Sequence, residues 1–277
     1  MIPSAQSTRV TPARRGLGGR FASVTFAASL LFSASNINAA PHLDVPYVPT
    51  PPDVVQRMLE MAEVQPDDNL IDLGSGDGRI VVAAVRDFDV QNALGIDLDP
   101  ERVAEARAIA EQEGIADRAT FEQGDLFEKD LSEASVLTMY LLSTVNARLR
   151  PVILETMEPG TRIVSHAFDM GPWEADEFDT VNGASVYLWI VPAQVGGQWR
   201  LSMAEGEQAT LMLQQNYQEL HASADRDGTD IAVTDPKLKG DEIRFSIGRD
   251  EYVGKVEGDR IVAADGSDVE GWYAERL

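Results

Sequence analysis

The chain has 277 residues, of which 44% are hydrophobic, so it can hold one large domain or two modest ones around a real core. It contains no cysteine, which excludes disulfides, thiolate metal sites and cysteine nucleophiles, and its three scattered histidines do not favour a metal cluster. The formal net charge of −23 disfavours nucleic-acid binding, because phosphate contacts need a basic face, but it allows basic protein partners.

The first forty residues have a composition of their own. They hold four arginines and no acidic residue, and an apolar run from Phe21 to Ser35 is followed by small residues that end at Ala40. This order is the layout of a secretory signal peptide. We therefore expect residues 1–40 to be a signal or anchor segment, with the protein exported or anchored in the inner membrane. A cytoplasmic protein with a later start codon is the alternative.

The most informative stretch of the chain follows a short lead-in. Residues 41–52 are rich in proline and predict an extended segment, and the apolar spacing of residues 53–64 predicts a helix. Two apolar runs, 69–71 and 80–85, then flank the sequence Asp72-Leu73-Gly74-Ser75-Gly76-Asp77-Gly78-Arg79. The pattern predicts a strand, a glycine-rich turn and a helix, in which the turn backbone can come close to a ligand.

The spacing of the glycines narrows the ligand. Asp-x-Gly-x-Gly-x-Gly differs from the Gly-x-Gly-x-x-Gly of dinucleotide binders, and it lacks the Gly-Lys-Ser/Thr ending of a P-loop. Asp72 stands at the end of the predicted strand, where a phosphate binder would avoid negative charge. We therefore expect a cationic ligand.

Strands and helices alternate up to about residue 193. Further strands are predicted at 94–97, 119–122, 134–142, 161–168 and 184–191, and further helices at 100–114 and 146–157. This alternation predicts a doubly wound α/β sheet over residues 41–193. From residue 196 onward, short alternating runs separated by turns predict a small antiparallel β domain over residues 194–277, with a partly closed barrel as one form of it.

Three acids at the ends of three successive strands carry a resemblance. Asp72 is followed by Asp97, about 20 residues after the glycines, and by Asp125 in Gln123-Gly124-Asp125-Leu126. The set resembles the cofactor motifs of class I S-adenosylmethionine (SAM) methyltransferases. The resemblance implies a Rossmann-like sheet of the seven-stranded type and SAM as the cofactor.

The resemblance also implies the cofactor-binding residues. They are Asp72, Gly74, Ser75, Gly76, Asp77, Gly78, Asp97, Asp125 and Leu126. In such a site Asp72 lies near the ammonium of the amino-acid tail, Asp97 accepts hydrogen bonds from the ribose hydroxyls, and Asp125 accepts one from the adenine amino group. Each acid also has a plainer explanation. Asp72 could cap the following turn, Asp97 could serve the turn before Pro100, and Asp125 could be a simple loop acid.

A narrower resemblance bears on the acceptor. The stretch 72–81, with Tyr47-Val48-Pro49 ahead of it, is similar to the family of lysine methyltransferases that act on the ATP synthase c subunit and the adenine nucleotide translocase. The similarity covers about residues 45–193 and leaves out the β domain. It implies a protein substrate, which includes a protein associated with a membrane. The oligomeric state stays open.

Candidate acceptor-side residues lie at the end of the fourth strand and after the fifth. Tyr140 could orient an amine and Asp169 could attract an ammonium, and we take these two as the catalytic candidates. Ser143, Asn146, His166 and Trp173 are nearby in the sequence. The plainer interpretation is that Tyr140 packs in the core and that His166 is an interior histidine.

The sequence thus favours a SAM-dependent methyltransferase acting on a protein lysine amine. Methyl transfer needs proximity and alignment rather than a nucleophile on the protein. Two rivals remain: a small-molecule methyltransferase, and a non-catalytic, exported SAM-binding interaction protein.

Overall fold

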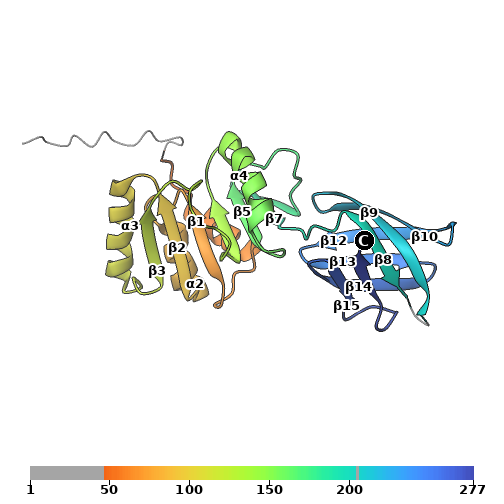
Figure 1. Cartoon of the computed structure of the whole chain (residues 1–277). Coiled ribbons are helices and arrows are strands. Elements are labelled where there is room, and N and C mark those ends of the chain that lie inside the picture. Colours follow the sequence, from red (N-terminus) through yellow and green to blue (C-terminus); the bar gives the residue numbers. More distant parts are fainter. Residues whose placement is uncertain (1–46, 204–205) are drawn as a thin grey trace, which may run out of the picture. The chain divides into compact units, whose positions relative to one another are not determined.

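The computed structural model describes residues 47–203 and 206–277 (Figure 1). The predicted signal or anchor segment, residues 1–40, lies outside the described residues, so that prediction stays as it is. Among the described residues, no helix has both the length and the apolar character that crossing a membrane requires.

The first sheet has seven strands, in the order β3-β2-β1-β4-β5-β7-β6. Its strands are β1 (Asn69–Leu73), β2 (Asn92–Asp97), β3 (Ala119–Gln123), β4 (Val136–Met139), β5 (Arg162–His166), β6 (Glu177–Val181) and β7 (Ala184–Ile190). The pairs from β3 to β5 are parallel, and β7 runs antiparallel to both of its neighbours. This arrangement confirms the predicted doubly wound α/β class.

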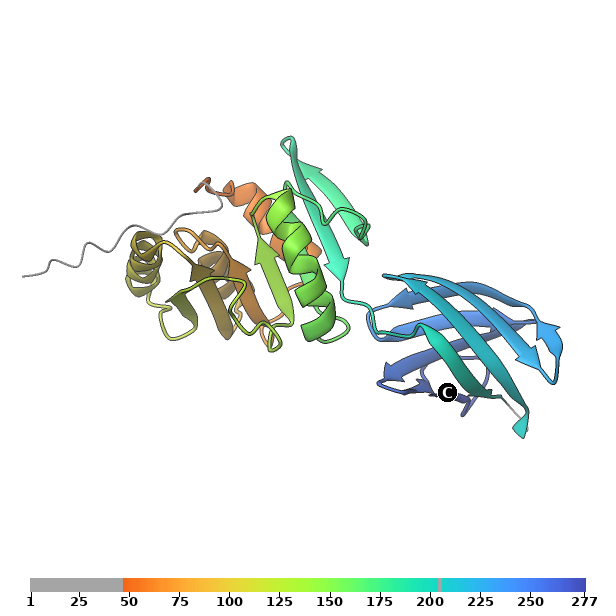
Figure 2. The ribbon, with the colours of Figure 1, turned by 45° about the horizontal axis from the view of Figure 1, so that its top comes forward.

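Four helices cover the two faces of this sheet. They are α1 (Pro52–Met61), α2 (Arg79–Phe88), α3 (Pro100–Glu113) and α4 (Ser143–Thr156). The first three share one apolar cluster with one face of the sheet, whereas α4 packs with the other face. Figure 2 shows α4 in front of the sheet and α1 behind it. Both faces are therefore buried, which explains the nearly continuous apolar runs of the central strands.

The second sheet is antiparallel and has nine strands, in the order β11-β10-β9-β8-β16-β15-β14-β13-β12. They are β8 (Gly197–Ser202), β9 (Gln208–Asn216), β10 (Glu219–Arg226), β11 (Thr229–Ile231), β12 (Val233–Lys239), β13 (Glu242–Ile247), β14 (Asp250–Glu257), β15 (Arg260–Ala263) and β16 (Tyr273–Arg276). Their inner faces enclose a cluster that includes Trp199, Phe245 and Trp272. The separate β sheet confirms the second part of the predicted fold class.

The structure differs from the predicted elements mainly at their ends. The predicted strand 134–142 shrinks to Val136–Met139, because the backbone leaves the sheet before Tyr140 and turns into α4 three residues earlier than predicted. No helix connects β3 to β4. The loop that replaces it buries Leu131 and Ala134 on the face covered by α4.

Candidate active site

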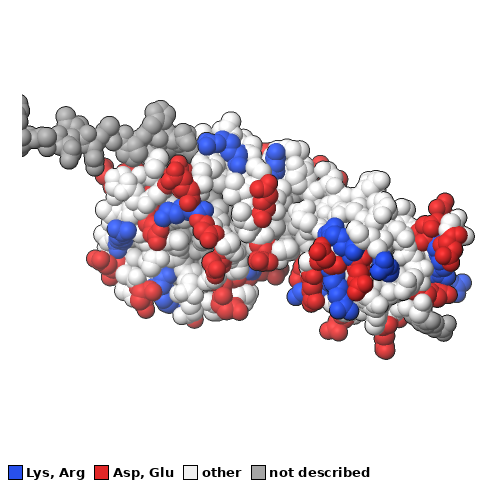
Figure 3. All heavy atoms as spheres, viewed as in Figure 1, with Lys and Arg blue, Asp and Glu red and all other residues white. Residues whose placement is uncertain are grey.

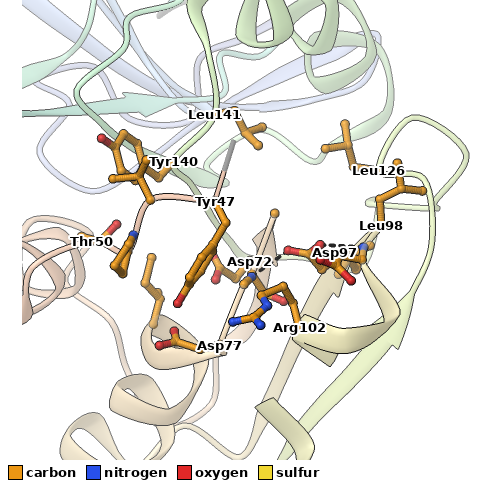
Figure 4. A pocket seen from close by; sticks show the side chains of 18 of the residues that line it. Tyr47, Thr50, Asp72, Asp77, Asp97, Leu98, Arg102, Leu126, Tyr140 and Leu141 are labelled. Carbon is orange, nitrogen blue, oxygen red and sulfur yellow. Dashed lines mark hydrogen bonds between the residues drawn. The ribbon is translucent and has the colours of Figure 1, made fainter. Parts of the chain in front are cut away.

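A cavity opens at the carboxyl ends of the parallel strands, where ligands bind in sheets of this kind (Figure 4). It encloses about 1030 Å³, counting its open mouth. All of the site residues predicted from the sequence line it, except Gly78 and Asp169. The structure therefore brings together side chains that lie up to 68 positions apart, from Asp72 to Tyr140.

The glycine loop has the close backbone approach that its sequence predicts. Gly76 has a φ of 53°, a region that favours glycine. Its N–H donates to an Asp97 carboxylate oxygen at 2.7 Å, and the N–H groups of Gly74 and Ser75 donate to the carbonyl of Ile96. The loop is thus tied to the end of β2. Gly78 stays outside the cavity, because it forms the left-handed N-cap of α2.

Asp72 is the buried acid of the site. It lies beside Thr138 in the β1–β4 register, and the Thr138 hydroxyl donates to its carboxylate at 2.8 Å. Burial raises the pKa of Asp72 to about 7, against the effect of the Thr138 hydrogen bond, and the charges of Asp97 and Asp77 raise it further. A cationic ligand would oppose this shift, which fits the charge that the sequence predicts for the ligand.

Asp97 and Asp125 each accept hydrogen bonds from the local backbone and stay available to a ligand. Asp97 accepts from the N–H of Asp99 at 2.9 Å, besides Gly76, and Asp125 accepts from the N–H of Phe127 at 2.9 Å. Both nevertheless line the cavity. A carboxylate has about four acceptor positions, so these hydrogen bonds leave capacity for a ribose or an adenine group.

Asp77 forms an ion pair with Arg79 across the last turn of the loop. The guanidinium donates to both carboxylate oxygens, at 2.9 and 2.5 Å. Burial by itself would raise the pKa of Asp77, but the hydrogen bonds and the charge of Arg79 lower it overall. Asp77 is therefore ionised at neutral pH and adds a fixed negative charge to the cavity.

On the acceptor side, the structure separates the two catalytic candidates. Tyr140 lines the cavity, and its ring lies 3.9 Å from that of His166, centroid to centroid. His166 is buried, as an interior histidine would be, and burial lowers its pKa. Asp169 is not among the cavity-lining residues, and its carboxylate accepts from the N–H of Gly171 at 3.1 Å. The catalytic role of Asp169 stays a prediction that this geometry does not support.

Several cavity residues are absent from the predicted set. They are Tyr47, Val48, Pro49, Thr50, Arg79, Ile80, Ile96, Leu98, Asp99, Arg102, Gly124, Phe127, Leu141 and Val145. Tyr47-Val48-Pro49 belongs to the stretch that carries the narrower resemblance, so a signal for the lead-in was present in the sequence. No sequence pattern indicated Leu98 and Arg102, because their position in the cavity depends on the direction of the chain between β2 and α3.

The sequence is similar to those of known methyltransferases. The family described as the ANTKMT methyltransferase domain matches residues 72–177. A protein-lysine N-methyltransferase of Saccharolobus islandicus is 46% identical over 155 residues, which are 54% of this chain and 95% of that relative. The chain belongs to this methyltransferase family.

Two further relatives extend the comparison for the methyltransferase. The adenine nucleotide translocase lysine N-methyltransferase of mouse is 31% identical, over 48% of this chain and 57% of its own length, so the chain spans little more than half of it. A crystal structure titled RNA methyltransferase from Salinibacter ruber, in complex with S-adenosyl-L-homocysteine, has 51% identity and a TM-score of 0.52. It covers 53% of this chain and 96% of its own.

SAM is the cofactor of the methyltransferase, and the cavity fits it. The buried Ser75 hydroxyl has no hydrogen-bond partner, although it lines the cavity, and a buried polar group normally has one. The acids Asp72, Asp77 and Asp97 suit a ligand with a sulfonium and an ammonium, and Leu126 and Phe127 provide an apolar wall. Among the described residues, no cluster of three or more histidine, aspartate or glutamate side chains could hold a metal ion.

Proposed function

We propose that this methyltransferase modifies the ε-amine of lysine in a protein. The observation that carries the proposal is the 46% identity to the Saccharolobus islandicus protein-lysine N-methyltransferase, over 95% of that relative. The mouse relatives named for the adenine nucleotide translocase and for the ATP synthase c subunit agree in the type of acceptor. A membrane-associated protein as the acceptor is the narrower form of the proposal.

RNA is the competing acceptor, because the Salinibacter ruber structure is titled an RNA methyltransferase. The charge of this chain favours protein over RNA. Its formal net charge is −23, and on the face in Figure 3 acidic and basic side chains are interspersed without a continuous basic patch. Since phosphate contacts supply most of the affinity for nucleic acid, an RNA acceptor would have to overcome net repulsion. A lysine side chain is attracted instead.

The residues of the cavity perform a limited set of tasks. Bound SAM supplies a methyl group that is already activated on a sulfonium. The glycine loop, Asp72, Asp97 and Asp125 bind and orient it from the ends of β1, β2 and β3. Tyr140 stands at the end of β4, where its phenol can accept a hydrogen bond from an amine and orient the nitrogen lone pair. The acceptor must arrive neutral or lose its proton to water, since an ammonium has no lone pair.

The proposal is tested with the full chain, labelled SAM and two acceptors in parallel, a lysine-rich protein and a folded transfer RNA. We expect label in the protein, as methyl-lysine by mass spectrometry, that survives ribonuclease. An Asp97→Ala variant, which should bind SAM more weakly, is the control and should incorporate less label at a limiting SAM concentration. Label that enters only the RNA would replace the proposal with the competing one. Binding of SAM without transfer to either acceptor would favour a small-molecule methyltransferase or a non-catalytic SAM-binding protein.

The location of the protein is a separate proposal. We infer export or inner-membrane anchoring from the composition of residues 1–40, which lie outside the described structure. Because SAM is made in the cytoplasm, an anchor that leaves residues 41–277 on the cytoplasmic side fits the enzyme best. Fractionation of cells that produce the full chain, followed by protease treatment of intact spheroplasts, tests this. Digestion of the methyltransferase part would contradict the cytoplasmic-side anchor and favour export.

A further inference from the structure

Residues 47–50, which are separated from α1 by Pro51, line the cofactor cavity without belonging to the sheet or to a helix. Tyr47, Val48, Pro49 and Thr50 all line it. Figure 4 shows the ring of Tyr47 pointing into the cavity, between Asp77 and Arg102. We call residues 47–50 the strap.

Tyr47 makes three contacts with the cofactor-binding elements. Its ring packs on the glycine loop so closely that a Cβ added to Gly76 would lie 2.6 Å from Cε2 of the ring. The negative charge of the Asp77 carboxylate acts on its phenol, and the Arg102 guanidinium lies 4.9 Å from the ring centroid. Burial, together with the negative charge of Asp77, raises the pKa of the phenol, which therefore remains protonated and able to donate.

The other end of the strap is anchored at Thr50. Its carbonyl accepts a hydrogen bond from Arg79 at 2.9 Å, and its hydroxyl bonds with Nδ1 of His166 at 3.1 Å. Thr50 is only 3% exposed, whereas Tyr47 is 45% exposed. Thr50 is thus held at two points. Arg79, which follows the glycine loop, binds its carbonyl, and His166, at the end of β5, binds its hydroxyl. The more exposed end of the strap carries the aromatic ring.

We propose that Tyr47 is a cofactor-binding residue, and that Thr50 is the positioning residue that holds the strap and its ring over the cavity. The ring lies beside Gly76, where the backbone approach is closest, so a ligand on the loop contacts it and is shielded from water. An aromatic face also attracts a cationic ligand. The inference rests on the SAM site and not on the lysine acceptor of the proposed function.

The same anchor joins the two halves of the site. His166, which holds Thr50, lies against the ring of Tyr140, with centroids 3.9 Å apart. If the strap is displaced, the Thr50–His166 hydrogen bond next to Tyr140 is lost, and Tyr47 no longer covers the cofactor. The Thr50 hydroxyl is the smallest group whose removal tests this arrangement.

The test is calorimetric binding of SAM to the full chain and to single variants. We expect Tyr47→Ala to weaken binding by about tenfold or more, and Tyr47→Phe by about fivefold or less, because the phenylalanine keeps the ring and loses only the hydroxyl. The matched control is Tyr273→Ala in the second sheet, which also removes a tyrosine stacked near an arginine, Arg260, at 5.2 Å. Equal or tighter binding by Tyr47→Ala would overturn the proposal and show that the ring only fills the cavity before the ligand arrives.

A pair of variants tests the anchor. Thr50→Val keeps the side-chain shape and removes the hydroxyl, whereas Thr50→Ser keeps the hydroxyl. We expect SAM affinity to be weaker by roughly three- to tenfold for Thr50→Val and to recover in Thr50→Ser. A lower melting temperature of Thr50→Val with unchanged affinity would assign Thr50 a structural role only and overturn the positioning part. Because the readout is binding, failure to methylate lysine would leave these outcomes untouched.

Discussion

The substitution Asp72→Asn isolates the cost of a buried acid in the cofactor site. Asp72 is 2% exposed, and its partner Thr138 can donate to an amide oxygen as well as to a carboxylate. Asparagine therefore keeps the shape and the hydrogen bond and removes the charge. We expect the variant to be more stable than the natural chain at alkaline pH in the absence of cofactor, and to bind SAM more weakly.

The size of the effect follows from the pKa. The pKa of Asp72 rises from 3.8 to about 7 on folding, because burial disfavours its charged form. Each unit corresponds to about 1.4 kcal/mol, so ionising Asp72 in the folded chain costs about 4 kcal/mol. Between about pH 4 and pH 7 the native state binds more protons at this site than the unfolded state. The free energy of unfolding therefore falls as pH rises through this range, and the loss is complete above about pH 7.

The assay is urea unfolding of the cofactor-free chain at about pH 5 and about pH 8, on either side of the raised pKa. The advantage of Asp72→Asn over the natural chain should grow by roughly 2–4 kcal/mol between the two pH values. Asp125→Asn, an exposed acid of the same site, is the matched control and should show no such growth. If the free energies of unfolding of Asp72→Asn and the natural chain differ by the same amount at both pH values, burial does not set the protonation of Asp72.

Three further predictions concern Asp97, the glycine loop and the second sheet. Asp97→Ala removes the acceptor that ties Gly76 to β2, so calorimetry should show roughly a tenfold loss of SAM affinity or more, and retained affinity would contradict the assignment. Gly76→Ala places a Cβ 2.6 Å from Tyr47 at a φ of 53°, so we expect loss of SAM binding and about 1–3 kcal/mol lower stability in urea. Gly254→Ala would place a Cβ 2.6 Å from the Trp272 ring and should cost about 1–3 kcal/mol while leaving SAM affinity unchanged. A Gly254→Ala variant that loses SAM binding would show that the second sheet supports the cofactor site.

The cofactor half of the site was predictable because local rules define it. A strand end, a glycine turn and a helix start are contiguous in the sequence, so Asp72 and Gly76 could be placed before the fold was known. The parallel sheet then aligns the ends of β1, β2 and β3, which brings Asp97 and Asp125 to the same edge. Asp97 has the structural role, because its hydrogen bonds to backbone N–H groups tie the glycine loop to β2, and its ligand-binding role stays a prediction.

The acceptor half was less predictable because long-range packing determines it. Tyr140 and Asp169 both follow strands that end at the same edge, and that rule placed both in the site. Tyr140 does line the cavity, but the chain after His166 turns sharply, with Ala167 at a φ of 67°, and the Asp169 carboxylate caps its own turn. The resemblance includes Tyr47 but gives it no role, because nothing in an extended, proline-rich segment indicates which surface the segment crosses.

The second sheet adds something other than the cofactor chemistry. Within the part of the chain that the structure describes, the residues that line the cavity run from Tyr47 to Val145, so none of them belongs to the second sheet, which begins with β8 at Gly197. The Saccharolobus islandicus relative agrees, since 155 matched residues account for 95% of it and leave no room for a second sheet of nine strands. A domain that a functioning relative lacks does not supply the shared reaction. Its contribution is therefore separate from that shared reaction, and the Gly254→Ala variant, assayed with several protein acceptors, tests whether the second sheet affects the choice of acceptor.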